Sequence, residues 1–296
     1  MVEKKTVNEP RKSHGELLGA PTSNLYISSS IDKIFEKGFT RGDFAELISA
    51  NNGPRVEYLN EVVAGIEMRY IRDSFQAFDN LIFTPEKNGV LVVGELLKDV
   101  KGEKEVIVSD FGIGGNVLRS GKLIVTKESS RNSEWVGTLE AMGYAVDFLP
   151  VPPLEEHTDL SRRMGFNGHI DTEVNFVQTE KGYMFIVNND YYQRYAAEVD
   201  ILVKKYGGEI KIIISHDEQT KLRGVNFIEL PNGKVVVPEN CLETRALLVE
   251  SIGKDNVIPV KVDVSKFNGI AQTLSDDGRF ITLWFHGGLR CLTNLI

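Results

Sequence analysis

Cys291 stands near the end of the sequence, in the segment Gly-Gly-Leu-Arg-Cys at 287–291. A glycine pair after an apolar run, here 280–285, lets the chain bend sharply and present the next side chain to a cavity. A cysteine in that position can act as a nucleophile, because its thiolate attacks electrophilic carbon. Taken alone, a single cysteine is more often a small buried thiol. Both interpretations stay open until its partners are considered.

His169 and Asp171 are the second pair of residues that could do chemistry. They alternate with Ile170, so on a strand both side chains would face the same side, and Glu173 would continue that face. An imidazole that titrates near neutral pH can accept and return a proton, and a neighbouring carboxylate can hold a cation or orient the ring. The alternative is an exposed histidine beside a helix-capping aspartate.

Three further polar residues follow apolar or glycine-rich stretches. Glu86 comes just after the apolar stretch 80–83, and Asn116 ends a glycine cluster at 112–116. That cluster precedes an expected strand and lacks the lysine and helix of a phosphate-binding loop. Arg131 suits a two-pronged contact with a carboxylate. A solvated turn glutamate and an ordinary arginine at a helix entry are the competing interpretations.

An internal repeat begins near residue 80. Each copy starts with an asparagine-containing strand, continues through a glycine-containing turn, and enters a strongly apolar strand, a pattern typical of β-hairpins. The four copies start at Asn80, Asn116, Asn175 and Asn226. After three of them, at 133–142, 191–206 and 239–252, the sequence predicts a helix and then another apolar strand. The predicted unit is therefore strand–turn–strand–helix–strand.

Such a unit cannot bury both its sheet and its helix alone, so neighbouring copies must pack together. About five units fit the 296 residues, which favours a five-bladed α/β-propeller. A generic α/β sheet without a closed ring is the alternative. The region 24–70 does not fit the repeat clearly, although 58–69 has helical character. We expect a flexible leader at 1–23 and one α/β-propeller domain at 24–296.

Composition narrows the set of partners. The net charge is −8 and the pI is about 5.3, which disfavours nucleic acid and anionic lipid, because phosphate binding needs clustered Lys and Arg. The five histidines and two cysteines show no metal-ligand spacing, so we expect neither a metal nor an organic cofactor. The expected partner is a small molecule, and the oligomeric state stays open.

The first residues are polar and do not resemble a signal peptide. No run approaches the roughly 20 apolar residues of a membrane-spanning helix. A disulfide between the two cysteines, Cys241 and Cys291, is not expected. These features predict a reduced protein of the cytoplasm that does not associate with membranes.

In motif order and repeat structure, the chain from about Asn80 to its end resembles the guanidine-modifying (pentein) superfamily. That group comprises arginine and agmatine deiminases, dimethylarginine dimethylaminohydrolases and amidinotransferases. The segment 287–291 resembles the family's terminal Gly-Gly-x-(Arg/His)-Cys loop, and 169–171 resembles its His-x-Asp element. The weaker matches are 83–86 to Phe-x-x-Asp, 114–117 to Gly-Gly-Asp-Val, and 130–132 to part of Ser-x-Arg-Thr-Asn.

The resemblance implies a hydrolase that acts on a carbon–nitrogen bond of a linear amidine, on arginine or a derivative. Cys291 would attack the planar guanidine carbon and form a covalent thiouronium, while His169 would protonate the departing amine and then activate water. Asp171 and Glu86 would hold the guanidinium edges. Arg131 would meet a substrate carboxylate, and Asn116 would contact the far end of the substrate.

The sequence also departs from the family pattern. Ile113 occupies the place of a glutamate, Asn116 replaces an aspartate, and Glu86 is one methylene longer than the expected aspartate. Substrate identity is therefore open. An amidinotransferase, in which an amine replaces water, is one alternative. A non-catalytic propeller that serves as a binding module is the other.

Overall fold

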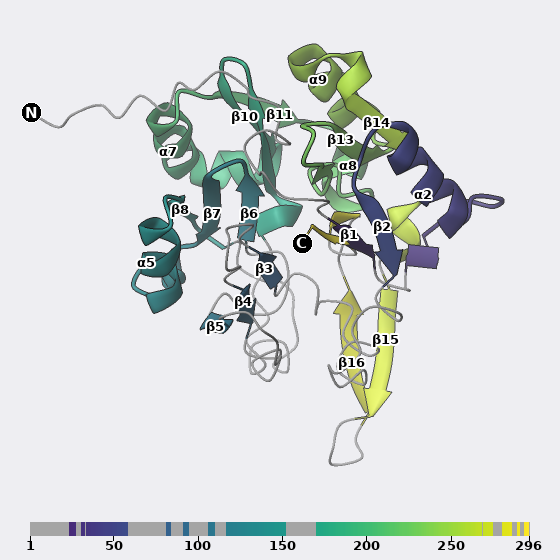
Figure 1. The fold of residues 1–296 in the computed structure, drawn as a ribbon, viewed down its shortest axis with the longest axis horizontal. Helices are drawn as coiled ribbons and strands as arrows, with labels where there is room; N and C mark the ends of the chain where they lie inside the picture. The colour runs from purple at the N-terminus through teal and green to yellow at the C-terminus, as the bar shows by residue number, and fades with distance from the viewer. Residues whose placement is uncertain are drawn as a thin grey trace, which may run out of the picture.

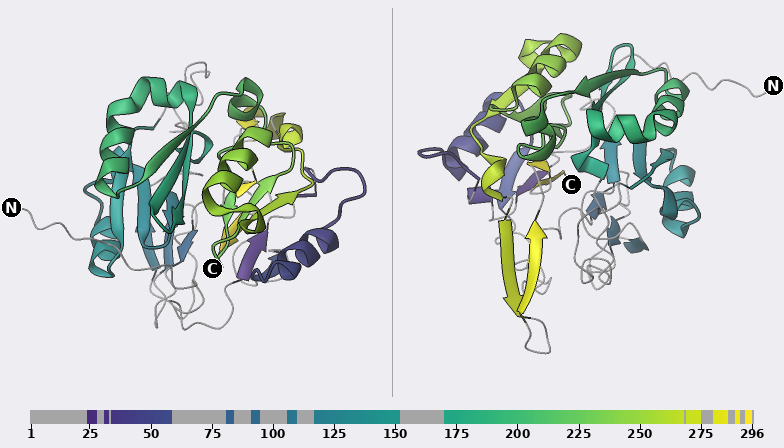
Figure 2. Two further views of the ribbon diagram at one scale, coloured as in Figure 1. Left: turned by 90° about the horizontal axis from the view of Figure 1, so that it is seen from above. Right: turned by 180° about the vertical axis from the view of Figure 1, so that it is seen from behind.

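The computed structural model describes residues 24–27, 31–32, 34–58, 81–83, 91–94, 106–109, 117–151, 170–267, 269–274, 280–285, 289–290 and 293–295. These residues form an α/β fold of small mixed sheets, with helices at the periphery (Figures 1 and 2).

One repeat unit is described almost completely. Strands β9 (Val174–Thr179) and β10 (Gly182–Asn188) form an antiparallel hairpin, and β10 pairs in parallel with β11 (Glu209–Ile213). Helix α7 (Asn189–Lys205) makes the crossover that a parallel pair requires. The helix ends before Gly207, whose φ of 63° lies in the left-handed region that favours glycine. This unit confirms the predicted strand–turn–strand–helix–strand order.

Three other sheets have the same strand order and directions. In each, the first strand is antiparallel to the middle strand, which is parallel to the third. Two of them contain the predicted crossover helix between the middle and third strands. The sheets are β3 (Leu81–Phe83), β4 (Leu91–Gly94) and β5 (Val106–Ser109); β6 (Val117–Ser120), β7 (Leu123–Lys127) and β8 (Ala145–Leu149) with α5 (Glu134–Ala141); and β12 (Ile228–Glu229), β13 (Val235–Pro238) and β14 (Val257–Val260) with α9 (Leu242–Ile252).

A fifth three-stranded sheet is built from both ends of the chain. Strand β17 (Thr293–Leu295) is antiparallel to β1 (Asn24–Ile27), which is parallel to β2 (Arg55–Tyr58). Helix α2 (Arg41–Ala50) lies between β1 and β2, so the region that was difficult to assign from sequence repeats the unit. Tyr58 ends a strand, and the rest of the stretch expected to be helical lies outside the described residues. The remaining hairpin is β15 (Gly269–Leu274) with β16 (Phe280–Phe285).

The cores between sheets follow from strand alternation. On β10, Phe185 and Val187 pack with residues of β6 and β7, whereas Met184 and Ile186 pack with residues of β13, β14 and α9. On β13, Val236 packs instead toward β1 and α2. Successive side chains of a strand point to opposite faces, so each middle strand contributes to two cores. Apolar residues on both faces explain the nearly continuous hydrophobic runs in these strands.

Two carboxylates, the buried Glu218 and the partly exposed Glu243, lock α9 to the short helix α8 (His216–Thr220). Glu218 accepts hydrogen bonds from the backbone N–H groups of Glu243 and Thr244, at 2.6 and 2.9 Å, and from the Thr244 hydroxyl at 2.7 Å. In return, Glu243 accepts from the backbone N–H groups that lead into α8, those of Ile214 and Ser215. Each helix start thus has its unpaired donors satisfied by the other helix.

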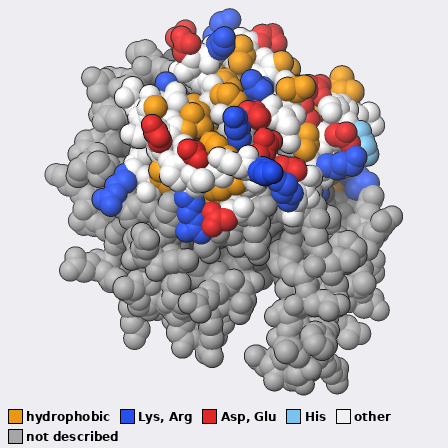
Figure 3. All heavy atoms as spheres, turned by 90° about the vertical axis from the view of Figure 1, so that its right-hand side faces the viewer, with side chains coloured by type: hydrophobic (Ala, Val, Ile, Leu, Met, Phe, Trp, Pro, Cys, Tyr) orange, Lys and Arg blue, Asp and Glu red, His pale blue; other side chains and the backbone are white. Residues whose placement is uncertain are grey.

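The surface and helices of the described part add two observations. Acidic and basic side chains are intermixed over the described face in Figure 3, rather than gathered into the single basic patch that phosphate binding requires. None of the helices that could be searched combines the length and the apolar composition needed to cross a bilayer.

Glu173, directly before β9, carries a desolvated carboxyl group. Its side chain accepts a hydrogen bond from Asn188 at 3.1 Å, and its backbone carbonyl accepts from the Asn188 N–H at 2.8 Å. Burial raises the pKa of Glu173 above its ordinary value, although the nearby Arg223 opposes this shift. The folded state therefore favours the protonated acid, and ionisation of this group destabilises it.

We expect Gly224→Ala to destabilise the fold by about 1–3 kcal/mol, the usual range for overpacking. A Cβ at this position would overlap Oγ1 of Thr244 and lie 3.0 Å from Oε2 of Glu218, within the α8–α9 lock. Chemical denaturation measures the effect. Gly137→Ala on α5 is the matched control, since open space surrounds its added methyl group. Equal stability of the two variants would contradict the packing described here.

We expect Glu173→Gln to raise the melting temperature at pH 7, with a difference from wild type that vanishes as the pH falls towards 4. A raised folded-state pKa means that wild type loses stability as pH rises from the unfolded pKa through the folded one, and glutamine removes that loss. Thermal melts across this pH range test the sign. The prediction fails if the melting temperature of Glu173→Gln minus that of wild type falls, rather than rises, from pH 4 to pH 7.

Candidate active site

Asp171 lies in a short 3-10 helix, η5 (Ile170–Thr172), and its side chain is fully buried. The backbone N–H of Glu173 donates to the carbonyl of Ile170 at 2.9 Å, which closes the turn. The prediction that 169–171 forms part of a strand is therefore wrong at 170 and 171, because this turn replaces strand pairing, and β9 begins only at Val174. His169 lies outside the described residues, directly before η5.

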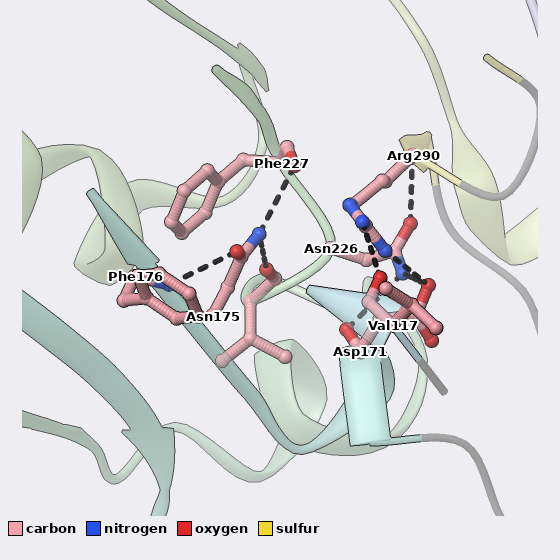
Figure 4. A network of polar contacts seen from close by, with 8 residues as sticks. Val117, Asp171, Asn175, Phe176, Asn226, Phe227 and Arg290 are labelled. Atoms are coloured by element: carbon pink, nitrogen blue, oxygen red, sulfur yellow. Dashed lines mark hydrogen bonds and ion pairs between the residues drawn. The ribbon is translucent and has the colours of Figure 1, made fainter. Parts of the chain in front are cut away.

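Asn226 contacts Asp171 from a separate sheet (Figure 4). Its side-chain amide donates to Oδ2 of Asp171 at 2.9 Å and to the Asp171 backbone carbonyl at 3.1 Å. Asn226 lies just before β12, in a turn in which its own N–H donates to the carbonyl of Arg223 at 2.8 Å. It is completely buried, like Asp171. Two sheets are thus joined at the points where their first strands begin.

Arg290 joins the same network through both its backbone and its side chain. Its backbone N–H donates to Oδ1 of Asn226 at 2.7 Å and to the Asn226 carbonyl at 3.2 Å. Its guanidinium lies 3.4 Å from Oδ2 of Asp171 and donates to the carbonyl of Val117 at 2.6 Å. Val117 is the first residue of β6. The network therefore connects the start of β6, the turn before β9, the turn before β12 and the C-terminal segment (Figure 4).

The network places the chain neighbours of three predicted site residues together. Val117 directly follows Asn116, Asp171 is two residues from His169, and Arg290 directly precedes Cys291. Asn116, His169 and Cys291 themselves lie outside the described residues, as do Glu86 and Ile113. Of the six residues that the sequence singled out, the structure describes Asp171 and Arg131.

The charges in this network are compensated. A buried carboxylate is costly unless it is paired and hydrogen-bonded, and Asp171 has both a guanidinium and an amide on Oδ2. The Arg290 guanidinium in turn bonds a backbone carbonyl. Within the described part of the chain, His, Cys, Asp and Glu side chains do not gather in groups of three or more that could hold a metal ion. The arrangement is suited to binding a cation at a buried carboxylate.

Arg131 has a different environment. It forms a bidentate pair with Glu128, with both contacts at 2.7 Å, and its guanidinium lies 4.4 Å from the centre of the Phe148 ring. Both partners of the pair are more than half exposed, and the hydrogen bond from Arg131 lowers the pKa of Glu128. Contact of Arg131 with a substrate carboxylate stays a prediction.

Cys241, the other cysteine, is a structural thiol. It is fully buried at the start of α9, and its sulfur lies 3.7 Å from the carbonyl of Leu222. Burial raises the pKa of the Cys241 thiol well above its ordinary value, which suppresses the reactive thiolate. Cys241 therefore does not compete with Cys291 as a candidate nucleophile.

Sequence reasoning did not assign a role in the site to Asn226 or Arg290. The sequence marks Asn226 only as the start of a predicted hairpin, although an asparagine starts each of the four predicted hairpins. In the preceding unit, the side-chain amide of Asn175 donates to the carbonyls of Val225 and Phe227, at 2.8 and 3.1 Å. The recurrence of asparagine was the feature that could have drawn attention to Asn226.

Comparison with known proteins places the fold. No protein-family model and no curated protein sequence matches the chain. Among solved structures, it is similar to a dimethylarginine dimethylaminohydrolase in adduct with S-methyl-L-thiocitrulline, with a TM-score of 0.50 and 14% identity, over 93% of this chain and 100% of the other. It is also similar to SxtG, a saxitoxin-pathway amidinotransferase from Microseira wollei, with a TM-score of 0.51 and 12% identity, over 92% and 93% of the two chains.

At these identities the similarity concerns the fold alone. Each alignment covers more than nine tenths of both chains, so it applies to the whole architecture rather than to one motif. The two solved proteins are a dimethylaminohydrolase and an amidinotransferase, two of the enzyme types whose motifs the sequence resembles. The comparison therefore confirms that this chain is similar in fold to those two proteins.

Proposed function

We propose that this protein is a cysteine-dependent enzyme that hydrolyses a carbon–nitrogen bond of a guanidine, on arginine or an arginine-derived compound. The observation that carries the proposal is the network of Val117, Asp171, Asn226 and Arg290. It joins Val117, which follows Asn116, and Arg290, which precedes Cys291, to Asp171, which lies two residues after His169. These contacts support the proposal that Asn116, His169 and Cys291 act at one site.

The proposal includes the closure of the units into a single five-bladed α/β-propeller domain at 24–296. Two observations support closure. Strand β17 completes the sheet of β1 and β2, so the end of the chain supplies the first strand of its first unit. Cores are shared between successive sheets, from β6–β8 through β9–β11 and β12–β14 to β1 and α2. In a closed ring, the first strands of all units would surround the site.

The chemistry begins with attack of the Cys291 thiolate on the guanidine carbon. A carbon–sulfur bond forms, one carbon–nitrogen bond breaks, and the departing nitrogen takes a proton from His169. His169, now neutral, accepts a proton from water as the water attacks the thiouronium carbon. The carbon–sulfur bond then breaks and regenerates the thiolate. The net change is hydrolysis of one carbon–nitrogen bond.

Four side chains are assigned to substrate binding: two carboxylates, one guanidinium and one amide. Asp171 and Glu86 hold the edges of the planar guanidinium, whose forked donors match carboxylate oxygens. Arg131 binds a substrate carboxylate, and Asn116 contacts the part of the substrate away from the reacting carbon. An arriving guanidinium would compete with Arg290 for Asp171, and an arriving carboxylate would compete with Glu128 for Arg131.

The same covalent intermediate allows a second outcome. If an amine rather than water attacks the thiouronium carbon, the product is a new guanidine and the protein is an amidinotransferase. The similarity in fold extends to SxtG, whose name describes that reaction, as well as to the dimethylaminohydrolase. Assays with and without an added amine separate the two. A urea-type product without the amine indicates hydrolysis, whereas turnover that requires the amine indicates transfer.

We expect Cys291→Ser to lower turnover by on the order of a thousandfold or more, because a serine hydroxyl at neutral pH is a far weaker nucleophile than a thiolate. Formation of the ureido product, citrulline from arginine and methylarginines or N-carbamoylputrescine from agmatine, measures activity together with release of urea, and mass spectrometry measures an adduct on Cys291. Cys241→Ala is the control, and it should lose stability rather than chemistry. Near-wild-type turnover by Cys291→Ser on any of these substrates would exclude the covalent mechanism.

We expect Asp171→Asn to lower kcat/KM for a guanidine substrate by about 10- to 100-fold, the effect of losing a hydrogen bond to a charged group. The amide keeps the shape of the side chain but removes the charge that holds the guanidinium. Asp217→Asn, which removes an exposed carboxylate paired with Lys221, is the control. If both variants retain wild-type kcat/KM, Asp171 does not bind substrate.

A further inference from the structure

We infer that Asn226 is a positioning residue that fixes the segment carrying Cys291 against the segment carrying His169 and Asp171. This inference rests on the proposed function and deepens it. The side chain of Asn226 connects the two segments directly, through Oδ1 to the backbone N–H of Arg290 and through Nδ2 to Asp171. Arg290 is the residue before the proposed nucleophile, so the bond acts on the backbone one peptide away from it.

The chemistry of asparagine suits this place. Its carboxamide presents an acceptor on one side and donors on the other, and both are used: Oδ1 accepts at 2.7 Å and Nδ2 donates at 2.9 and 3.1 Å. An aspartate would lose the donor and place a second carboxylate against Asp171. An alanine would remove one acceptor from the Arg290 N–H and one donor from the fully buried Asp171 carboxylate, which is costly.

Asn226 is itself held on several sides. Its N–H bonds the carbonyl of Arg223, which has the unusual φ of 50° and so forms a tight turn. The side-chain amide of Asn175 donates to the carbonyls of Val225 and Phe227, the residues on either side of Asn226. Gly224 packs against the α8–α9 lock. Because Asn226 is rigidly held, it can fix the position of Arg290 relative to Asp171.

The two asparagines illustrate a division of roles. Asn175 lies within β9, opposite Ile186, whereas Asn226 lies two residues before β12, and both are buried. Asn175 bonds only backbone atoms of the next unit in the contacts described above, whereas Asn226 bonds a site carboxylate and the backbone of the C-terminal segment. Asn175 thus joins two neighbouring units, whereas Asn226 links Asp171 to the segment that precedes Cys291.

The link matters because covalent attack requires the thiolate to be at the right distance and angle to the bound guanidinium carbon. A misplacement of about 1 Å can cost on the order of a hundredfold in rate. Loss of Asn226 should therefore reduce the rate enhancement that Asp171 gives to the reaction of Cys291 with a cationic electrophile. It should change the intrinsic reactivity of the thiol much less.

The test compares two alkylating reagents on the full-length protein. 2-Chloroacetamidine carries a planar cation like that of a guanidine, and iodoacetamide is neutral. Because both react with the same thiolate at the same pH, the ratio of their rates at Cys291 cancels the thiolate fraction. Rates are followed by mass spectrometry of the Cys291 peptide in wild type, Asn226→Ala and Asn226→Asp. Ser120→Ala is the control, since it removes a buried hydrogen bond to the N–H of Gln178 at the other end of β6.

We expect the amidine-to-amide ratio to fall at least about tenfold in both Asn226 variants and to stay within about twofold in Ser120→Ala. Asn226 variants that are folded, as judged by melting, and that keep the wild-type ratio would overturn the inference. If either variant does not fold, Asn226→Ser replaces it and is judged by the same ratio. A wild-type amidine-to-amide ratio at Cys291 that is no higher than the ratio measured for glutathione would instead overturn the proposed function.

Discussion

The buried carboxylate of Asp171 is the constraint on which the arrangement of the site depends. With no solvent exposure, its charge must be balanced by protein groups, because an unpaired buried ion would cost several kcal/mol. The balancing groups, Asn226 and Arg290, come from positions 55 and 119 residues away in the sequence. The fold must therefore bring these distant segments together before the carboxylate can be tolerated in its interior.

The ends of the chain take part in meeting that constraint. Arg290 lies three residues before β17, and β17 is held in the sheet of β1 and β2. Leu289, directly before Arg290, is buried in the core that includes Leu25 and Ile27 of β1. The N-terminal unit thus anchors the segment that carries Arg290 on both sides of it. Stability of that sheet and geometry at Asp171 are coupled for this reason.

The sequence allowed the repeat and the similarity in fold to be predicted, but not the contacts that join the units. Hairpins such as β9–β10 depend on local alternation and a glycine turn, and the segment around Asn175 shows both. The bond from Arg290 to Asn226 spans 64 residues, and no local pattern encodes it. The 3-10 turn at Asp171 was missed because three residues of alternation fit a strand equally well. Motif order selected His169, Asp171 and Cys291, whereas the recurrence of asparagine marks Asn226 without revealing its contacts with Asp171 and Arg290.

The Arg290–Asp171 pair also bears on selectivity under the proposed function. The carboxylate assigned to the substrate guanidinium already faces a guanidinium of the chain itself, at 3.4 Å. A cationic substrate that binds there would either replace the Arg290 guanidinium or bind beside it. The buried negative charge would therefore stay compensated throughout. A neutral ligand that displaced Arg290 would leave the carboxylate uncompensated, at a cost of several kcal/mol. The same electrostatics that makes Asp171 tolerable in the folded protein therefore favours cationic guanidines over neutral ureas, which are the products of hydrolysis.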